Sequence, residues 1–189
     1  MKLLFVDCCI SQRGKESRTL ALAKAYIDAF RAAHPDWEVE RADPMDLPPL
    51  TAEFLDDRDT RKGEFSAPMF AAARQFQSAD SIVVAAPYWD LSYPAQLKTY
   101  IEHISVNGLC YHYTEQGCQG DCKAEKLVYL TSGGDFEGED SVGVLHWKQL
   151  CRMFGIGTFS YAFAGGLDID PVKTPELLAQ ACEKARSLV

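Results

Sequence analysis

The chain has 189 residues, a length at which one domain with a full-sized hydrophobic core is expected over residues 1–189. Its formal net charge of −8 argues against a nucleic-acid-binding protein, which needs a basic surface. No apolar run approaches the ~20 residues of a membrane-spanning helix, and the first residues lack the features of a signal peptide, so we expect a cytoplasmic protein with no membrane partner.

Short apolar segments alternate with amphipathic segments along the chain. Strands are predicted at residues 2–6, 37–41, 81–86, 125–131 and 158–164. Helices are predicted at residues 17–33, 67–79, 140–154 and 174–188, and a further helix contains Leu97, Ile101 and Ile104. Ser92 is a candidate N-cap for that further helix, and Pro94 suits its first turn. Residues 43–65 are rich in proline and acidic residues and are expected to form a long irregular excursion.

This order of elements predicts an α/β fold with a five-stranded parallel sheet. The alternation of strands and helices places helices on both faces, and five strands suit the flavodoxin-like order 2-1-3-4-5. In such sheets a ligand binds beyond the carboxyl ends of the strands, at the switch point between strands one and three. The loops that follow the strands are therefore the candidate site.

The loop after the first strand is a candidate phosphate-binding loop. Ser17 and Thr19 place hydroxyl groups at the start of a helix, where free backbone N–H groups and the helix dipole favour an anion. Arg13, Lys15 and Arg18 add positive charge. The simpler interpretation is that Ser17 only caps the helix. The loop has neither the G-x-G-x-x-G fingerprint nor a G-x-x-x-x-G-K-[ST] phosphate loop, which disfavours a dedicated NAD-binding fold and an NTPase.

Two later loops complete a candidate flavin site. The segment Pro87-Tyr88-Trp89-Asp90-Leu91 follows a buried strand and offers planar side chains to a flat ligand. Ser132-Gly133-Gly134 follows the next strand, and its glycines allow the backbone to approach a ligand closely. A phosphate site, a site for a flat ring and a close backbone approach together describe the binding of FMN. Tyr111 and Tyr113, in a predicted aromatic hairpin, are either ordinary hairpin residues or contacts to the ligand.

Other chemistries have weaker support. The seven cysteines stand at positions 8, 9, 110, 118, 122, 151 and 182. Cys118 and Cys122 have C-x3-C spacing, unlike most zinc sites, and a second pair is missing, so reduced thiols and no metal site are expected. His103 and His146 fall on helices and no G-x-S-x-G elbow is present, which excludes a hydrolase triad of that kind. Asp7 ends the first strand as in receiver domains, but their acceptor Asp after strand three and Lys after strand five are absent.

The sequence resembles the flavodoxin-like NAD(P)H:quinone oxidoreductases, and among them the FMN-dependent NADH-azoreductases, over nearly its whole length. Ala85-Ala-Pro-Tyr-Trp-Asp-Leu-Ser-Tyr-Pro-Ala-Gln-Leu-Lys98 is similar to the A-P-M-Y-N-F-x-x-x-x-Q-L-K flavin loop of that family. Tyr113-Thr-Glu-Gln-Gly117 resembles its Y-T-E-x-G segment, and Thr131-Ser-Gly-Gly134 resembles its S-x-G-G loop. The chain departs from the family pattern at Cys8-Cys9, at the Trp-Asp pair and at Leu91.

The resemblance implies a homodimer with two FMN sites at the interface, each using residues of both subunits. Together with the loops above, it gives as predicted cofactor-binding residues Cys9, Ser17, Arg18, Thr19, Pro87, Tyr88, Trp89, Asp90, Leu91, Ser132, Gly133 and Gly134. Tyr111 and Tyr113 are the predicted substrate contacts. No catalytic side chain is assigned, because the cofactor carries the chemistry in such enzymes.

The expected activity consists of two half-reactions at one site. NADH or NADPH delivers a hydride to FMN and leaves, and a quinone, azo or nitroaromatic compound then takes two electrons, which gives ping-pong kinetics. One alternative is a flavodoxin-like FMN electron carrier or redox sensor without NAD(P)H turnover. Another is a structural or interaction protein whose site is vacant.

Overall fold

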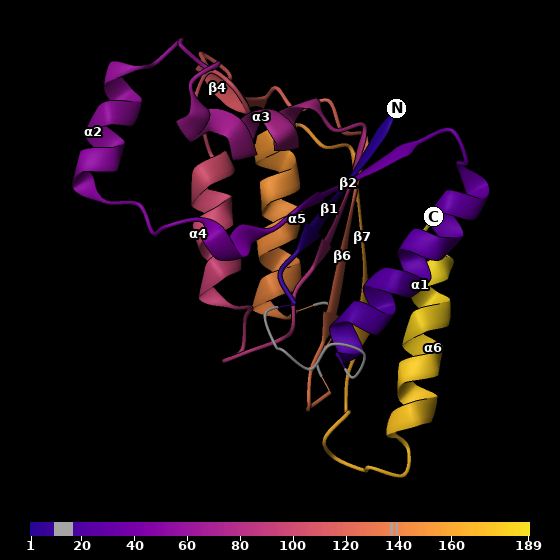
Figure 1. Ribbon diagram of the computed structural model, residues 1–189. Helices are drawn as coiled ribbons and strands as arrows, with labels where there is room; N and C mark the ends of the chain where they lie inside the picture. Colours follow the sequence, from indigo (N-terminus) through magenta and orange to yellow (C-terminus); the bar gives the residue numbers. More distant parts are fainter. Residues whose placement is uncertain (10–16, 137, 139) are drawn as a thin grey trace.

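Figure 1 shows a computed structural model of the protein, which describes residues 1–9, 17–136, 138 and 140–189. Five parallel strands form one sheet in the order β2-β1-β3-β6-β7. They are β1 (Lys2–Asp7), β2 (Glu38–Ala42), β3 (Ser81–Ala85), β6 (Lys126–Ser132) and β7 (Thr158–Ala164). Counted along the chain without the small hairpin, this is the order 2-1-3-4-5, so the predicted sheet is confirmed, with β2 and β7 at its edges.

Helices cover both faces of the sheet (Figure 1). On one face lie α1 (Arg18–Ala33) and α6 (Thr174–Arg186). On the other lie α3 (Ala71–Ser78), α4 (Ala95–Ile104) and α5 (Val142–Phe154). Alternate strand residues supply the two hydrophobic cores: Leu4 and Val6 belong to the first core, and Leu3 and Phe5 to the second. Among the described residues, no helix combines the length and apolar character needed to cross a membrane.

The helix α5 shows how the periodic pattern becomes a helix packed on the sheet. Val144, Trp147, Cys151 and Phe154 recur every three or four residues, and all four are buried. Ser141 accepts a hydrogen bond from the Val144 amide at 3.4 Å and begins the helix. Gly155 ends it in a left-handed conformation, with φ of 78°.

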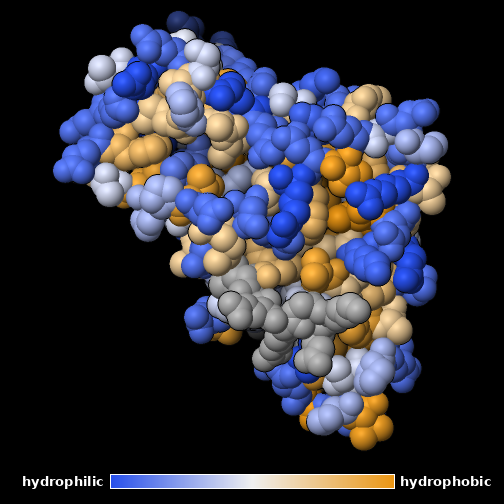
Figure 2. Space-filling view, in the orientation of Figure 1, coloured by the Kyte–Doolittle hydropathy of each residue, from blue (hydrophilic) through white to orange (hydrophobic). Residues whose placement is uncertain are grey.

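The prediction of an irregular excursion at 43–65 is wrong. This segment contains a short 3-10 helix, η2 (Pro44–Asp46), and the nine-residue helix α2 (Ala52–Thr60). Thr51 accepts a hydrogen bond from the Phe54 amide at 3.2 Å, and Asp57 pairs with Arg61 at 2.8 Å one turn along. The helix buries none of its residues, so it has no apolar face that a periodicity could reveal. It stands apart from the sheet, and the outer rim of this part of the surface is mostly hydrophilic (Figures 1 and 2).

The predicted start of the helix after β3 is also wrong. Helix α4 begins at Ala95, with Pro94 in the N-cap position and no side-chain cap. Ser92 instead pairs with Trp89 in an isolated β-bridge, so its backbone belongs to the preceding turn. The ring of Pro94 fixes φ of the residue just before the helix but cannot accept a hydrogen bond from the first turn.

The aromatic hairpin predicted around Tyr111 and Tyr113 is present and extends to Gly120. Strands β4 (Tyr111–Thr114) and β5 (Gly117–Gly120) pair antiparallel, and β5 packs on the end of α5. A Cβ atom on Gly120 would lie 1.9 Å from the Gly155 nitrogen and 2.0 Å from the Phe154 carbonyl carbon. The hairpin therefore seats against α5 at a contact that only glycine permits.

Candidate functional site

A cavity of about 230 Å3 opens at the carboxyl ends of the strands. Its lining residues are Cys9, Ser17, Arg18, Thr19, Pro87, Tyr88, Trp89, Ser132, Gly133, Gly134 and Asp168. The structure thus brings together every predicted cofactor-binding residue except Asp90 and Leu91. The role of all the predicted cofactor-binding residues as flavin ligands stays a prediction.

The start of α1 forms one wall of this cavity. Ser17 caps the helix, and its hydroxyl accepts a hydrogen bond from the Leu20 amide at 3.3 Å. The first turn of a helix leaves backbone N–H groups without intrahelical partners, which favours an anion at this end. Thr19 shares a buried 2.6 Å hydrogen bond with the Ser132 hydroxyl and so holds α1 against β6. The candidate cations Arg13 and Lys15 lie outside the described residues.

The loop after β3 forms a second wall through Pro87, Tyr88 and Trp89. The Tyr88 amide donates to the Ser132 carbonyl at 2.9 Å, and the Tyr88 ring meets the edge of the Phe163 ring at a centroid distance of 5.9 Å. Trp89 is 42% exposed, as expected of a side chain beside an open cavity.

Asp90 and Leu91 lie outside the cavity because the chain turns back at this point. Both have positive φ, 50° and 62°, and the flanking Trp89 and Ser92 exchange backbone hydrogen bonds of 2.8 and 3.3 Å. This geometry is that of a two-residue turn, which favours Asn and Gly at its centre. Leu91 occupies a conformation unfavourable for its residue type and is 68% exposed.

The loop after β6 forms the third wall and needs its glycines. A Cβ on Gly133 would lie 3.1 Å from the Tyr88 ring and 3.2 Å from the Phe163 ring. A Cβ on Gly134 would lie 2.5 Å from the Asp168 carboxylate. These glycines keep the aromatic loop, β7 and the loop after β7 close together around the cavity.

Asp168 is the lining residue that the sequence interpretation missed. It lies in the loop after β7, and its carboxylate accepts a hydrogen bond from the Arg18 guanidinium at 2.6 Å. Its amide donates to the Gly134 carbonyl at 3.1 Å. The available signal was its position after the last strand of the sheet, where loops contribute to ligand sites.

The two cysteines after β1 are neutral thiols. Burial raises the pKa of Cys8 to about 12. Burial also raises the pKa of Cys9, with the Asp7 charge adding to the rise and a hydrogen bond with Ser17 opposing it. Neither thiol therefore acts as a nucleophile at neutral pH. Within the described part of the chain, no group of three or more histidine, cysteine or acidic side chains is placed to hold a metal ion.

The predicted substrate residues do not line this cavity. Tyr111 lies beside a separate hollow of about 90 Å3 between α2, the segment that follows α4 and the hairpin. Tyr113 is 68% exposed on β4, and its ring meets that of Tyr111 edge to face at 5.8 Å.

Tyr93 and His146 join the loop after β3 to α5. The Tyr93 hydroxyl is hydrogen-bonded to Nδ1 of His146, and the two rings stack at 5.9 Å. Burial, and then the charge of Lys98, lower the pKa of His146. We therefore expect its contribution to the free energy of unfolding to be complete above the unfolded value of about 6.5 and to be lost as pH falls through the lower folded value.

Denaturant unfolding of the wild type and of His146→Phe at several pH values checks this expectation. The variant should lose less stability than the wild type as the solution is acidified through this range. If the free energy of unfolding depends on pH equally in the two proteins, the lowered pKa of His146 is contradicted.

Comparisons with known proteins agree with this architecture. Residues 1–189 match the model of a family described by its flavodoxin-like fold. An FMN-dependent NADH:quinone oxidoreductase of Clostridium beijerinckii is 32% identical over 191 residues, covering 98% of this chain and 96% of the relative. Another so named, from Pseudomonas fluorescens, is 32% identical over 182 residues and covers 88% of this chain and 87% of the relative.

Solved structures give the same fold. An azoreductase of Bacillus anthracis superposes with a TM-score of 0.86 at 24% identity, covering all of this chain and 98% of that one. An FMN-dependent NADH-azoreductase of the same species, solved in complex with FMN, superposes with a TM-score of 0.78 at 18% identity. The match covers 99% of this chain and 98% of the azoreductase chain. The chain belongs to the flavodoxin-like family, within which it is a relative of the FMN-dependent NADH:quinone oxidoreductases, as its motifs predict.

Proposed function

We propose that this chain is an FMN-dependent oxidoreductase that transfers electrons from NADH to a quinone or azo acceptor. The observation that carries the proposal is the cavity at the strand ends, where a helix start, an aromatic loop and a glycine loop meet. The names of the relatives, FMN-dependent NADH:quinone oxidoreductases at about 32% identity, support the same activity.

The residues around the cavity fit a phosphorylated flavin. The Ser17 hydroxyl and the first-turn amides of α1 would bind the phosphate, with the Arg18 charge nearby. Thr19 and Ser132 would hold that wall in place through their mutual hydrogen bond. Tyr88 and Trp89 would lie along the ring, and Gly133 allows the Tyr88 ring to stand close to the backbone of the loop after β6.

When bound, FMN supplies the hydride chemistry, accepting from the donor and giving to the acceptor. The protein's own part is to orient the ring and to limit access to it. One cavity without a separate dinucleotide motif suits a donor and an acceptor that visit in turn, which supports ping-pong kinetics. We extend the proposal to NADPH as a second donor and to nitroaromatic compounds as further acceptors.

A homodimer is part of the proposal. Trp89, Leu91 and Phe136 are exposed apolar side chains on the loops beside the cavity. Tyr113, exposed on β4, would contact the cavity of a second copy, and Tyr111, packed against the core, would support it from behind. Light scattering of the flavin-loaded protein should give twice the chain mass of 21.0 kDa. A value of one chain mass would contradict the dimer.

Rapid mixing of the flavin-loaded protein with NADH under anaerobic conditions tests the enzyme proposal. The flavin absorbance should bleach within seconds and return when a quinone is added. A flavin that stays oxidised for minutes with NADH and with NADPH would favour the electron carrier. A purified protein that binds no flavin would favour an interaction protein.

A further inference from the structure

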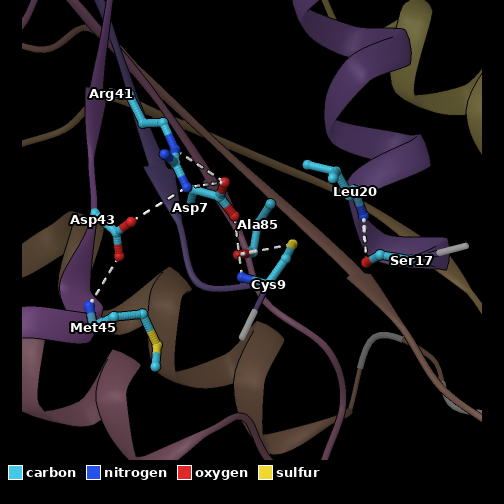
Figure 3. Close-up of polar contacts among 8 residues, drawn as sticks. All are labelled: Asp7, Cys9, Ser17, Leu20, Arg41, Asp43, Met45 and Ala85. Atoms are coloured by element: carbon cyan, nitrogen blue, oxygen red, sulfur yellow. Dashed lines mark hydrogen bonds and ion pairs between the residues drawn. The ribbon is translucent and has the colours of Figure 1, made fainter. Parts of the chain in front are cut away.

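Beside the cavity, an arginine lies between two carboxylates at the ends of neighbouring strands (Figure 3). Arg41, on β2, contacts the Asp7 carboxylate through Nε at 3.1 Å and through Nη2 at 2.9 Å. Its Nη2 also lies 3.3 Å from the Asp43 carboxylate. The register of the two strands explains the group, because Arg41 stands opposite Phe5, two residues before Asp7 and on the same face of the sheet.

The Asp7 carboxylate is connected directly to the cavity wall. It is buried at the end of β1, and its Oδ1 accepts a hydrogen bond from the Cys9 amide at 3.1 Å (Figure 3). Cys9 lines the cavity together with Ser17. Asp7 therefore fixes the backbone position of Cys9, where the chain leaves the sheet.

This arrangement creates an electrostatic problem for an anionic ligand. Two carboxylates and one guanidinium carry a sum of −1, and without the arginine the sum would be −2. The charge of Asp7 is felt at the cavity wall, since it adds to the rise in the pKa of the Cys9 thiol. The negative charge of Asp7 would repel a phosphate bound near Ser17 unless a positive charge neutralises Asp7.

We infer that Arg41 determines the preference of the cavity for a phosphorylated flavin by neutralising Asp7. The inference rests on the proposed function and deepens it. Asp7 contributes the backbone geometry of the loop through the Cys9 amide, and Arg41 removes the electrostatic penalty of that carboxylate. Arg41 is thus a positioning residue that acts through Asp7 and contacts no ligand.

Binding of FMN and of riboflavin, which lacks the phosphate, separates charge from structure. Arg41→Gln should weaken FMN binding on the order of tenfold, because one unit charge is uncovered near the phosphate, and should change riboflavin binding less than about twofold. The double variant Asp7→Asn with Arg41→Gln should regain FMN affinity, since Asn still accepts from the Cys9 amide without a charge. Arg41→Lys, which keeps the positive charge, should bind FMN nearly as well as the wild type.

Lys2→Gln is the matched control. It removes one positive charge from the same strand pair, where Lys2 contacts Glu40 at 2.5 Å, but at the end of the sheet away from the cavity. It should leave FMN affinity unchanged. High salt should narrow the difference between wild type and Arg41→Gln, because screening acts on the uncovered charge.

The outcomes are distinguishable. Equal weakening of FMN and riboflavin by Arg41→Gln, or no recovery in the double variant, overturns the charge role of Arg41 and leaves the flavin proposal intact. An Arg41→Gln protein with unchanged FMN affinity overturns it as well. A wild-type protein that binds neither flavin overturns the proposed function itself, and this inference with it.

Discussion

Ser17→Asp is expected to reduce FMN affinity by at least about a hundredfold while the protein stays folded. Asp is as good an N-cap as Ser, so the hydrogen bond to the Leu20 amide can be kept. The new carboxylate would occupy the place where the phosphate is expected, at the buried start of α1. Two anions cannot share the same few backbone N–H groups without strong repulsion.

Ser17→Asn is the control for this substitution, because Asn has nearly the same size and capping ability without the charge. Fluorescence titration of FMN into each protein measures the FMN affinity, and thermal unfolding of each protein measures its stability. The Asn variant should bind FMN within about tenfold of the wild type. An Asp variant that keeps full flavin occupancy would place the phosphate elsewhere.

The second large effect is expected at Gly120, far from the cavity. Gly120→Ala should lower the free energy of unfolding by about 3 kcal/mol, at the upper end of what overpacking usually costs. The added Cβ would overlap backbone atoms of Phe154 and Gly155, which cannot move aside as a side chain can. We expect the hairpin β4–β5 to shift away from α5 and to carry Tyr111 and Tyr113 with it.

Gly157→Ala is the matched control in the same region. Its Cβ would meet only the Glu125 carbonyl at 3.7 Å, an ordinary contact distance. Denaturant unfolding should show a change of less than about 1 kcal/mol for this variant. If both alanine variants are equally stable, the hairpin is not seated against the end of α5 as described.

Much of the fold was predictable because its elements have strong periodic signals. Strands buried on both faces are continuous apolar runs, and α5 repeats its buried residues every three or four positions. The loops that form the cavity were also predictable, since loops after parallel strands meet at one edge. Helix α2 lacked such a signal, because it buries nothing, and only its Thr51 cap marked its start.

The contacts across the site were not predictable from the chain. Asp168 reaches Arg18 across 150 positions of sequence, and Arg41 reaches Asp7 across 34. Neither contact has a characteristic spacing in the sequence, because each one forms only when particular strands become neighbours in a particular register. Charge alone does not identify the partners, because many other acidic and basic residues lie on the surface. The turn at Asp90 and Leu91 was hidden for another reason: Asp tolerates a positive φ, but Leu91, in the second central position, is not typical of such a turn.

The two edges of the sheet differ in their protection against unwanted association. The outer strand β2 has the sequence Glu-Val-Glu-Arg-Ala, and its charges discourage the addition of a foreign strand. The opposite outer strand β7, Thr-Phe-Ser-Tyr-Ala-Phe-Ala, has no charge and no proline, and it pairs only with β6 among the described strands. Heating or partial unfolding would therefore expose an aggregation-prone segment at one side of the molecule only, and a lysine at Ser160 would be the natural gatekeeper for a more soluble variant.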